Sequence, residues 1–391
     1  KKAKLKNANI NYIPTDNKDY IPALIEGIFQ SDYKFDTYKT KDKDKKINLT
    51  INLNNINNLN YDIINDISNI VNGINITREL VNIPAIDLYP EVLANKTLEL
   101  LEPLGVQVTV FDKSQIEELG MEAFLSVAKG SDREPKFIKI EYNPIDNGEV
   151  LALVGKGLTY DSGGYAIKPP LGMDTMMGDM AGSATVIGTI YALAKNNIKQ
   201  NVVGLIAACE NMISGKAYKN GDIVKSMKGT TIEVKNTDAE GRITLADALY
   251  YAATKTKAST IIDLATLTGA CVVGLGEFTT GVITNNDNLY SKLEEASLKS
   301  GEHIWQLPII EETRELVKSK IADITNSTGR YGGAITAGIF LEEFVENKPW
   351  VHMDIAGPAY TQTPYSYIPY GATGIPVKTL YNFIKYFSNN L

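Results

Sequence analysis

The stretch Asn236-Thr-Asp-Ala-Glu-Gly-Arg242, which continues as Ile-Thr-Leu-Ala-Asp247, joins a predicted strand to a predicted helix. The segment before it, Thr230–Lys235, alternates in hydrophobicity like a strand. The segment Thr244–Thr254 is an Ala/Leu-rich helical run, and Thr244 and Asp247 are spaced as a capping pair at its start. Turns between a strand and a helix are where α/β proteins place much of their chemistry.

Charged side chains occupy every second position of this turn: Asp238, Glu240 and Arg242. In an extended segment such residues point to the same side, so two carboxylates and a guanidinium would face one spot. A solvated surface strand can carry the same letters without any function. The position between a strand and a helix favours the functional interpretation.

Strands and helices alternate on both sides of the turn, which predicts an α/β fold with a mostly parallel central sheet flanked by helices. We expect residues 73–391 to form this C-terminal domain. Residues 1–72, with a helix near Asp19–Gln30 and a strand near Ile47–Leu53, are expected to form a smaller, shortened N-terminal α/β domain. A helix at about 61–81 would connect the two.

Composition narrows the function classes. The chain has 391 residues, 44% of them hydrophobic, and a net charge of −7, which disfavours nucleic acid and anionic membranes as partners. No segment approaches the length of a membrane span. The two cysteines, Cys209 and Cys271, lie in apolar runs, which suits buried thiols in a reducing compartment and predicts a cytoplasmic location.

The chain contains only two histidines, so a histidine-rich zinc site is excluded. Any metal centre must therefore use oxygen ligands, to which an amine could be added. We expect His352 to be a satisfied core residue and His303 to be a surface residue.

Two further stretches carry candidate chemistry. In Val154–Gly164 a strand ends in glycines that flank Lys156, and Asp161 follows; Lys168 lies just beyond. The spacing excludes a P-loop, which leaves a glycine-hinged loop that presents these side chains or a plain surface loop. In Gly172–Gly182, Asp179 lies among methionines that could fill the core or line a pocket.

The three stretches together supply four carboxylates and two nearby lysines. Four carboxylates in one pocket repel each other unless divalent ions neutralise them. Two ions about 3.5–4 Å apart, bridged by shared carboxylates, form a recurrent hydrolytic device.

The 236–247 stretch resembles the signature of the leucyl aminopeptidase family, the cytosol aminopeptidases. The likeness covers nearly everything from Arg78 to the C-terminus. The matching segments include Arg78-Glu-Leu-Val-Asn-Ile-Pro84, Val154-Gly-Lys-Gly157, Asp161-Ser-Gly-Gly164, Ala265-Thr-Leu-Thr-Gly269, Trp305-Gln-Leu-Pro308, Gly329-Arg-Tyr-Gly-Gly333 and His352-Met-Asp-Ile-Ala-Gly357. The resemblance implies a metal-dependent aminopeptidase whose catalytic domain is residues 73–391.

The resemblance also implies two divalent ions per subunit, zinc or manganese, with magnesium and cobalt as alternatives. Asp161, Asp238 and Glu240 would hold the readily exchanged ion. The tightly bound ion would be held by Lys156, Asp161, Asp179 and Glu240. Lys156 would bind as a neutral amine, which requires a lowered pKa near two dications.

In such a family member a metal-bridging hydroxide is the nucleophile. Lys168 would polarise the scissile carbonyl, and Arg242 would hold a bicarbonate ion that acts as general base. The residues implied for substrate binding are Met176, Asp179, Thr266, Leu267, Thr268 and Ala356.

The implied substrates are peptides with a free N-terminus, preferably with leucine or another large apolar first residue, and the implied assembly is a homohexamer. A DNA-binding or architectural role is an alternative, because some family members also bind DNA. The acidic composition and the lack of a basic stripe argue against it. A catalytically inactive scaffold and a di-metal phosphoesterase are weaker alternatives.

Overall fold

The computed structural model describes residues 7–11, 20–41, 48–52 and 62–386. Within them an eight-stranded sheet forms the centre, in the order β11-β10-β13-β9-β5-β6-β4-β3. The four middle strands run parallel, and antiparallel pairings join β10, β4 and β3. The predicted fold class is therefore confirmed. The strands are β3 (Gln107–Phe111), β4 (Lys136–Tyr142), β5 (Val150–Asp161), β6 (Asn201–Asn211), β9 (Ala258–Ala265), β10 (Thr279–Thr284), β11 (His303–Gln306) and β13 (Trp350–Asp354).

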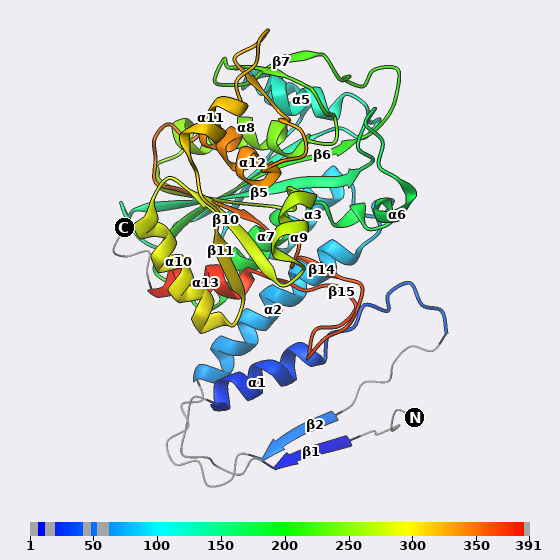
Figure 1. Cartoon of the computed structure of the whole chain (residues 1–391). Helices are drawn as coiled ribbons and strands as arrows, with labels where there is room; N and C mark the ends of the chain where they lie inside the picture. Colours follow the sequence, from blue (N-terminus) through cyan, green and yellow to red (C-terminus); the bar gives the residue numbers. More distant parts are fainter. Residues whose placement is uncertain (1–6, 12–19, 42–47, 53–61, 387–391) are drawn as a thin grey trace.

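Helices cover both faces of the sheet, so the middle strands are apolar on both sides. On β5, Leu151 and Leu153 pack into one core while Ala152 and Val154 pack into the other. In Figure 1 one helical layer lies above the sheet and the other below it. The upper layer contains α5 (Glu122–Ala128), α8 (Gly241–Lys255) and α12 (Gly333–Glu342); the lower contains α3 (Pro90–Leu101), α7 (Ala181–Lys195), α10 (Asp287–Ser300) and α13 (Val377–Tyr386).

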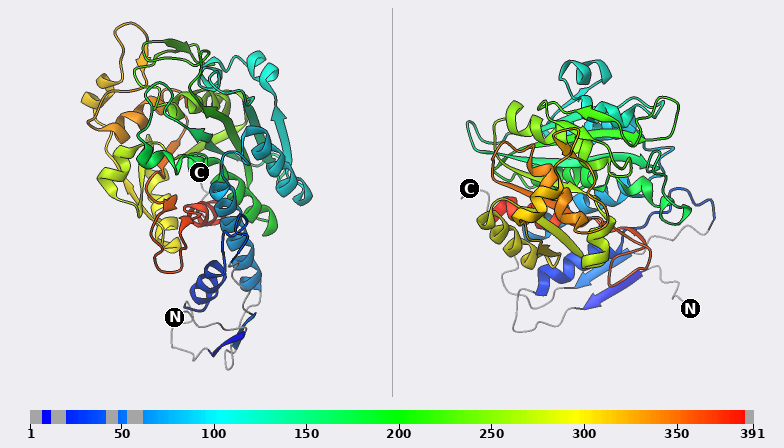
Figure 2. Two further views of the ribbon diagram at one scale, coloured as in Figure 1. Left: turned by 90° about the vertical axis from the view of Figure 1, so that its right-hand side faces the viewer. Right: turned by 45° about the horizontal axis from the view of Figure 1, so that its top comes forward.

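The N-terminal elements lie at one end of the molecule (Figure 2). Strand β1 (Asn7–Asn11) pairs in parallel with β2 (Asn48–Asn52). Helix α1 (Tyr20–Ser31) packs through Ile21 and Ile25 on Ile67 and Val71 of helix α2 (Asp62–Asn82). The far half of α2 packs on α7, so the predicted connector helix is confirmed as an element, and the division into two domains stays a prediction.

Short elements complete the chain. They are η1 (Glu102–Leu104), α4 (Lys113–Glu118), α6 (Pro170–Met173), η2 (Met176–Gly178), β7 (Ile223–Lys225), β8 (Thr231–Glu233), α9 (Gly269–Leu275), α11 (Glu311–Leu316), β12 (Ile324–Thr325), β14 (Tyr360–Thr361) and β15 (Gly371–Ala372). None of the helices in the described part of the chain combines the length and apolar character needed to cross a membrane.

The prediction for the start of α8 was wrong in detail. The helix begins at Gly241, and Thr244 lies inside it, donating its hydroxyl to the carbonyl of Gly241. The Asp247 carboxylate does not cap α8. It is fully buried and accepts hydrogen bonds from the backbone N–H groups of Phe124 and Met227, which ties α8 to α5 and to the loop between β7 and β8.

Candidate active site

The buried middle of β5 carries Lys156, whose ammonium is surrounded by oxygen atoms. Its Nζ donates to Asp179 Oδ1 at 2.9 Å and to the carbonyl of Thr266 at 3.1 Å, and it lies 3.0 Å from Glu240 Oε1. A Cβ on Gly241 would lie 2.4 Å from Lys156 Cε, so only glycine leaves room for this side chain at the start of α8.

Asp161 ends β5, and the neighbouring parallel strand β6 holds it in place. Asn211, the last residue of β6, donates from Nδ2 to Asp161 Oδ1 at 2.8 Å and to the carbonyl of Thr237 at 2.9 Å. The backbone N–H of Gly163 donates to the same carboxylate oxygen, so Oδ2 remains to face Lys168 at 2.8 Å. The sequence alone assigns no role to Asn211, although the carboxyl ends of adjacent parallel strands meet at one edge of a sheet.

The carboxylates of Asp238 and Glu240 converge on Asp161, as the sequence predicted. One oxygen from each of the three residues lies within 4.8 Å of the others. The predicted extended geometry is wrong, because Asp238 lies in a turn and Glu240 has α-helical angles, φ −76° and ψ −34°. Asp238 is also bound by Lys168, whose Nζ lies 2.6 Å from Oδ1.

Asp179 lies directly after η2 and before α7. Its Oδ1 accepts a hydrogen bond from the Thr266 hydroxyl at 2.7 Å, and its Oδ2 lies 2.7 Å from Lys156 Nζ. Lys156 and Thr266, which are 110 residues apart in the chain, thus both fix this carboxylate.

Burial and mutual charge shift the pKa values of the whole cluster. Burial and then the charges of Glu240 and Asp179 raise the pKa of Asp161 to about 8. Burial raises the pKa of Asp179 to about 6 against the opposing charge of Lys156. Burial lowers the lysine pKa values, but the carboxylates outweigh it and hold the pKa of both Lys156 and Lys168 above its ordinary value. Burial and like charge thus disfavour a fully ionised set of acids at this site, so a further cation would stabilise the cluster.

The residues fit divalent cations. Glu240 Oε2 is buried and has no hydrogen-bond partner among the described residues, which is costly for a carboxylate oxygen. Carboxylate oxygens are the ligands preferred by hard divalent ions, and the four acids outnumber the two ammonium groups. A bound dication would supply positive charge beside the acids. It would also favour the neutral amine of Lys156 over its ammonium form.

Arg242 lies behind the carboxylates and does not line the cavity that they share. Its NH1 donates to the carbonyl of Asn326 at 2.9 Å, while its buried Nε has no partner among the described residues. Burial lowers the pKa of Arg242 to about 10 against the charges of Glu240 and Asp354. One unsatisfied N–H of a guanidinium in the first turn of a helix fits a small anion.

The cavity beside the carboxylates has a volume of about 420 Å³. Every predicted substrate-binding residue lines it: Met176, Asp179, Thr266, Leu267, Thr268 and Ala356. It is also lined by Val272, Ala359 and Tyr360, to which the sequence had assigned no role. A cavity that combines carboxylates with apolar wall residues can hold a molecule with a cationic group and an apolar side chain.

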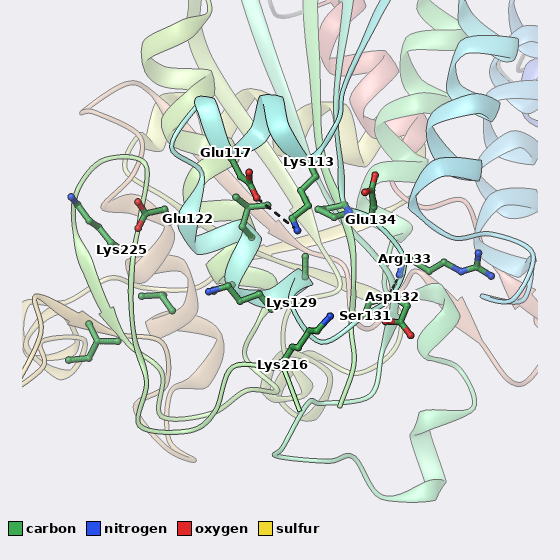
Figure 3. Close-up of a pocket in the computed structure, with 16 residues that line it drawn as sticks. Lys113, Glu117, Glu122, Lys129, Ser131, Asp132, Arg133, Glu134, Lys216 and Lys225 are labelled. Carbon is green, nitrogen blue, oxygen red and sulfur yellow. Dashed lines mark hydrogen bonds and ion pairs between the residues drawn. The ribbon is translucent and has the colours of Figure 1, made fainter. Parts of the chain in front are cut away.

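A second cavity, of about 780 Å³, lies beside α4 and α5 and has a different character. Figure 3 shows lysines and acids interleaved around it, with Lys113 paired to Glu117. Its acidic residues are exposed and are not gathered against one another, so the carboxylate cluster is the better candidate for catalysis.

The histidines lie in the predicted places, one in the core and one at the surface, but His352 is not the fully satisfied core residue that the sequence predicted. His303 is exposed at the start of β11. His352 is fully buried, and its Nδ1 lies 2.6 Å from Asp263 Oδ1, while Nε2 has no partner among the described residues. Neither histidine lines the carboxylate cavity.

Comparison with known proteins gives a consistent result. Residues 75–381 match the model of the cytosol aminopeptidase family, catalytic domain. A probable cytosol aminopeptidase of Clostridium tetani is 52% identical over 94% of this chain and 78% of its own length. One of Clostridium perfringens is 52% identical over 92% and 75%. Among solved structures, the bottromycin maturation enzyme BotP in complex with Mn superposes with a TM-score of 0.91 at 32% identity, covering 97% of this chain and 83% of that one.

Proposed function

Because this chain belongs to the cytosol aminopeptidase family, whose members are metal-dependent peptidases, we propose that it removes the N-terminal residue from peptides. The convergence of the Asp161, Asp238 and Glu240 oxygens within 4.8 Å, beside Lys156 and Asp179, carries the proposal. Such a set of acids is costly to bury without a catalytic or structural cation.

Two divalent ions would be held by the five residues Lys156, Asp161, Asp179, Asp238 and Glu240. When bound, they would act as Lewis acids toward the scissile carbonyl and supply a water molecule activated at neutral pH. Zinc and manganese are our candidates, and the manganese complex of the similar BotP structure supports the second. Asn211 would keep Asp161 in place through its 2.8 Å hydrogen bond.

Lys168 would interact directly with the reacting carbonyl. It lies on the cavity wall and bridges Asp161 and Asp238, and these acids hold its pKa above the ordinary value. A fixed ammonium beside the carbonyl would stabilise the negative charge that develops on its oxygen.

Arg242 would hold bicarbonate, which would accept the proton of the attacking water. The support is the free Nε–H of Arg242 and its place in the first turn of α8, where the helix dipole favours an anion. The planar fork of a guanidinium suits a bidentate oxyanion, and lysine lacks this fork.

The acidic end of the cavity would select the free amino group of the substrate, with Asp179 as a partner. The apolar walls, including Met176, Val272 and Ala356, would accept leucine or another large apolar first side chain. Leu267 would position the peptide through its backbone. A homohexamer in the cytoplasm is our expectation for the assembled enzyme. The alternative of a DNA-binding role receives no support from the comparisons, which match peptidases.

Hydrolysis of leucyl-p-nitroanilide tests the proposal. Activity should appear with Mn²⁺ or Zn²⁺, disappear with a chelator and return on reloading, while N-acetyl-leucyl-p-nitroanilide should not be cleaved. Absence of turnover in fully metal-loaded protein, or equal cleavage of the acetylated substrate, would refute an aminopeptidase. A phosphodiester substrate assayed in parallel would detect a phosphoesterase.

A further inference from the structure

The hairpin of β14 and β15 contributes Tyr360 to one wall of the cavity, and helix α2 packs against its second strand, β15 (Figure 1). Ala359 and Tyr360 line the cavity. Tyr360 pairs with Ala372 across the hairpin. The position of the returning strand β15 therefore decides where the Tyr360 ring stands.

Asn82, the last residue of α2, binds the returning strand. Its Oδ1 accepts the backbone N–H of Ala372 at 2.9 Å. The approach is so close that a Cβ on Gly371 would lie 2.5 Å from the same oxygen, and Gly371 has a φ of +104° that favours glycine. Asn82 also donates to the Tyr33 hydroxyl at 3.2 Å, which fixes the orientation of its amide.

Arg78, one turn earlier on α2, binds the residue that follows β15. Its Nε donates to the carbonyl of Thr373 at 2.8 Å. Thr373 in turn donates from its backbone to Ala359 at 3.0 Å and from its hydroxyl to Pro358 at 2.6 Å. Two hydrogen bonds thus connect the guanidinium to a residue of the cavity wall.

The other side of the guanidinium is bound to α1. NH2 donates to Gln30 Oε1 at 2.7 Å and NH1 to the Gln30 carbonyl at 3.2 Å. Arg78 is fully buried, and all its hydrogen-bond acceptors are neutral amide oxygens. Burying the Arg78 cation among neutral acceptors costs free energy, so the guanidinium needs all of these acceptors in place. Its rigid planar geometry in turn restricts where the acceptors can lie.

Helix α2 also comes close to the cavity at Gly178 of η2, a residue that lines the cavity. A Cβ there would lie 3.4 Å from Val81 Cγ1 and 3.9 Å from Tyr360 Cδ2. Gly178 thus separates α2 from the Tyr360 ring, and the depth of the cavity at this point depends on how closely the hairpin approaches α2.

We propose that Asn82 and Arg78 are positioning residues that fix the β14–β15 hairpin as the wall of the pocket for the first side chain, and so determine which first residues the enzyme accepts. The inference rests on the proposed peptidase function. A hairpin released from α2 would let Tyr360 move, which would weaken binding of large first side chains and leave the metal ligands in place.

The test compares Asn82→Ala with Asn69→Ala in the full chain loaded with Mn²⁺. Asn69 is the matched control because it lies on the same helix but donates to Asn196 of α7's C-cap, at 2.7 Å. KM and kcat are measured with alanyl-, leucyl- and phenylalanyl-p-nitroanilide. In Asn82→Ala the loss of one buried hydrogen bond should raise KM for the leucyl and phenylalanyl substrates about tenfold. KM for the alanyl substrate, kcat and metal content should stay near the control.

Amide hydrogen exchange provides a readout that does not need activity. The Ala372 N–H should exchange about tenfold faster in Asn82→Ala, and at the original rate in the control. If Asn82→Ala does not fold, the isosteric Thr373→Val should give the same change in KM, because it removes the hydroxyl that donates to the Pro358 carbonyl and accepts from the Ile375 N–H. An equal rise in KM for all three substrates, or unchanged exchange at Ala372, would overturn the inference. A wild-type chain that cleaves none of the substrates would instead refute the proposed function, and exchange would still decide whether Asn82 holds the hairpin.

Discussion

Lys156 and Gly241 lie so close that a Cβ on the glycine would stand 2.4 Å from Lys156 Cε. The lysine comes from β5 and the glycine begins α8, so the central sheet and a helix meet at one contact. The ammonium that contacts Glu240 and Asp179 can reach them only across the bare backbone of Gly241.

Gly241→Ala should therefore displace Lys156 and disturb the ion that it would hold. Overpacking of this kind costs about 1–3 kcal/mol. We expect a lower free energy of unfolding and reduced metal content, measured by denaturant titration and elemental analysis. Gly215→Ala is the control, because a Cβ there would meet nothing within 4 Å. Equal stability and metal content in the two variants would contradict a tight contact.

Glu240→Ala should abolish peptidase activity and reduce the metal content by at least one ion per chain. The reason is that Glu240 contributes an oxygen to the convergent set and would bridge both ions. Elemental analysis after gel filtration measures the change, and the surface variant Glu343→Gln is the control. Full metal content in Glu240→Ala would remove this residue from the ligand set.

Arg242→Ala should slow turnover by about 10²–10³-fold, a typical cost of losing one group that orients a catalytic base or stabilises the transition state. Metal binding should be spared, because the guanidinium faces Asn326 and not the cavity. Assays with and without bicarbonate provide the check. The wild-type rate should rise with bicarbonate, and a variant that responds equally would count against an anion site at Arg242.

Asp247 should make stability depend on pH. Burial raises its pKa to about 7, against the hydrogen bonds from Phe124 and Met227. A carboxyl whose pKa is raised on folding stabilises the fold fully below its unfolded pKa, near 4, and loses this contribution as pH rises through about 7. The contribution is on the order of 4 kcal/mol at most. The free energy of unfolding of the chelated protein should fall less between pH 5 and pH 8 in Asp247→Asn than in the wild type. If the unfolding free energies of the two proteins changed equally between pH 5 and pH 8, Asp247 would be ionised throughout that range.

Local pattern was enough to predict much of the fold. Helix α2 lies within one residue of its predicted range, about 61–81, because its hydrophobic periodicity is strong and its packing agrees with it. Strand β8 is shorter than predicted and belongs to a small separate sheet with β7 and β12, since nothing in its own six residues specifies a partner.

The sequence by itself determined which chemical groups meet in the site: four carboxylates and two lysines, carried by motifs that resemble one family. Only the tertiary structure decided how they face each other. Asp238 and Glu240 converge, but Arg242 diverges, because backbone that has turned helical at Glu240 rotates each side chain by about 100° from the last. The partners Asn82 and Ala372 are 290 residues apart, and no local pattern links them. Long-range contacts of this kind depend on the packing of whole elements, which periodicity alone does not encode.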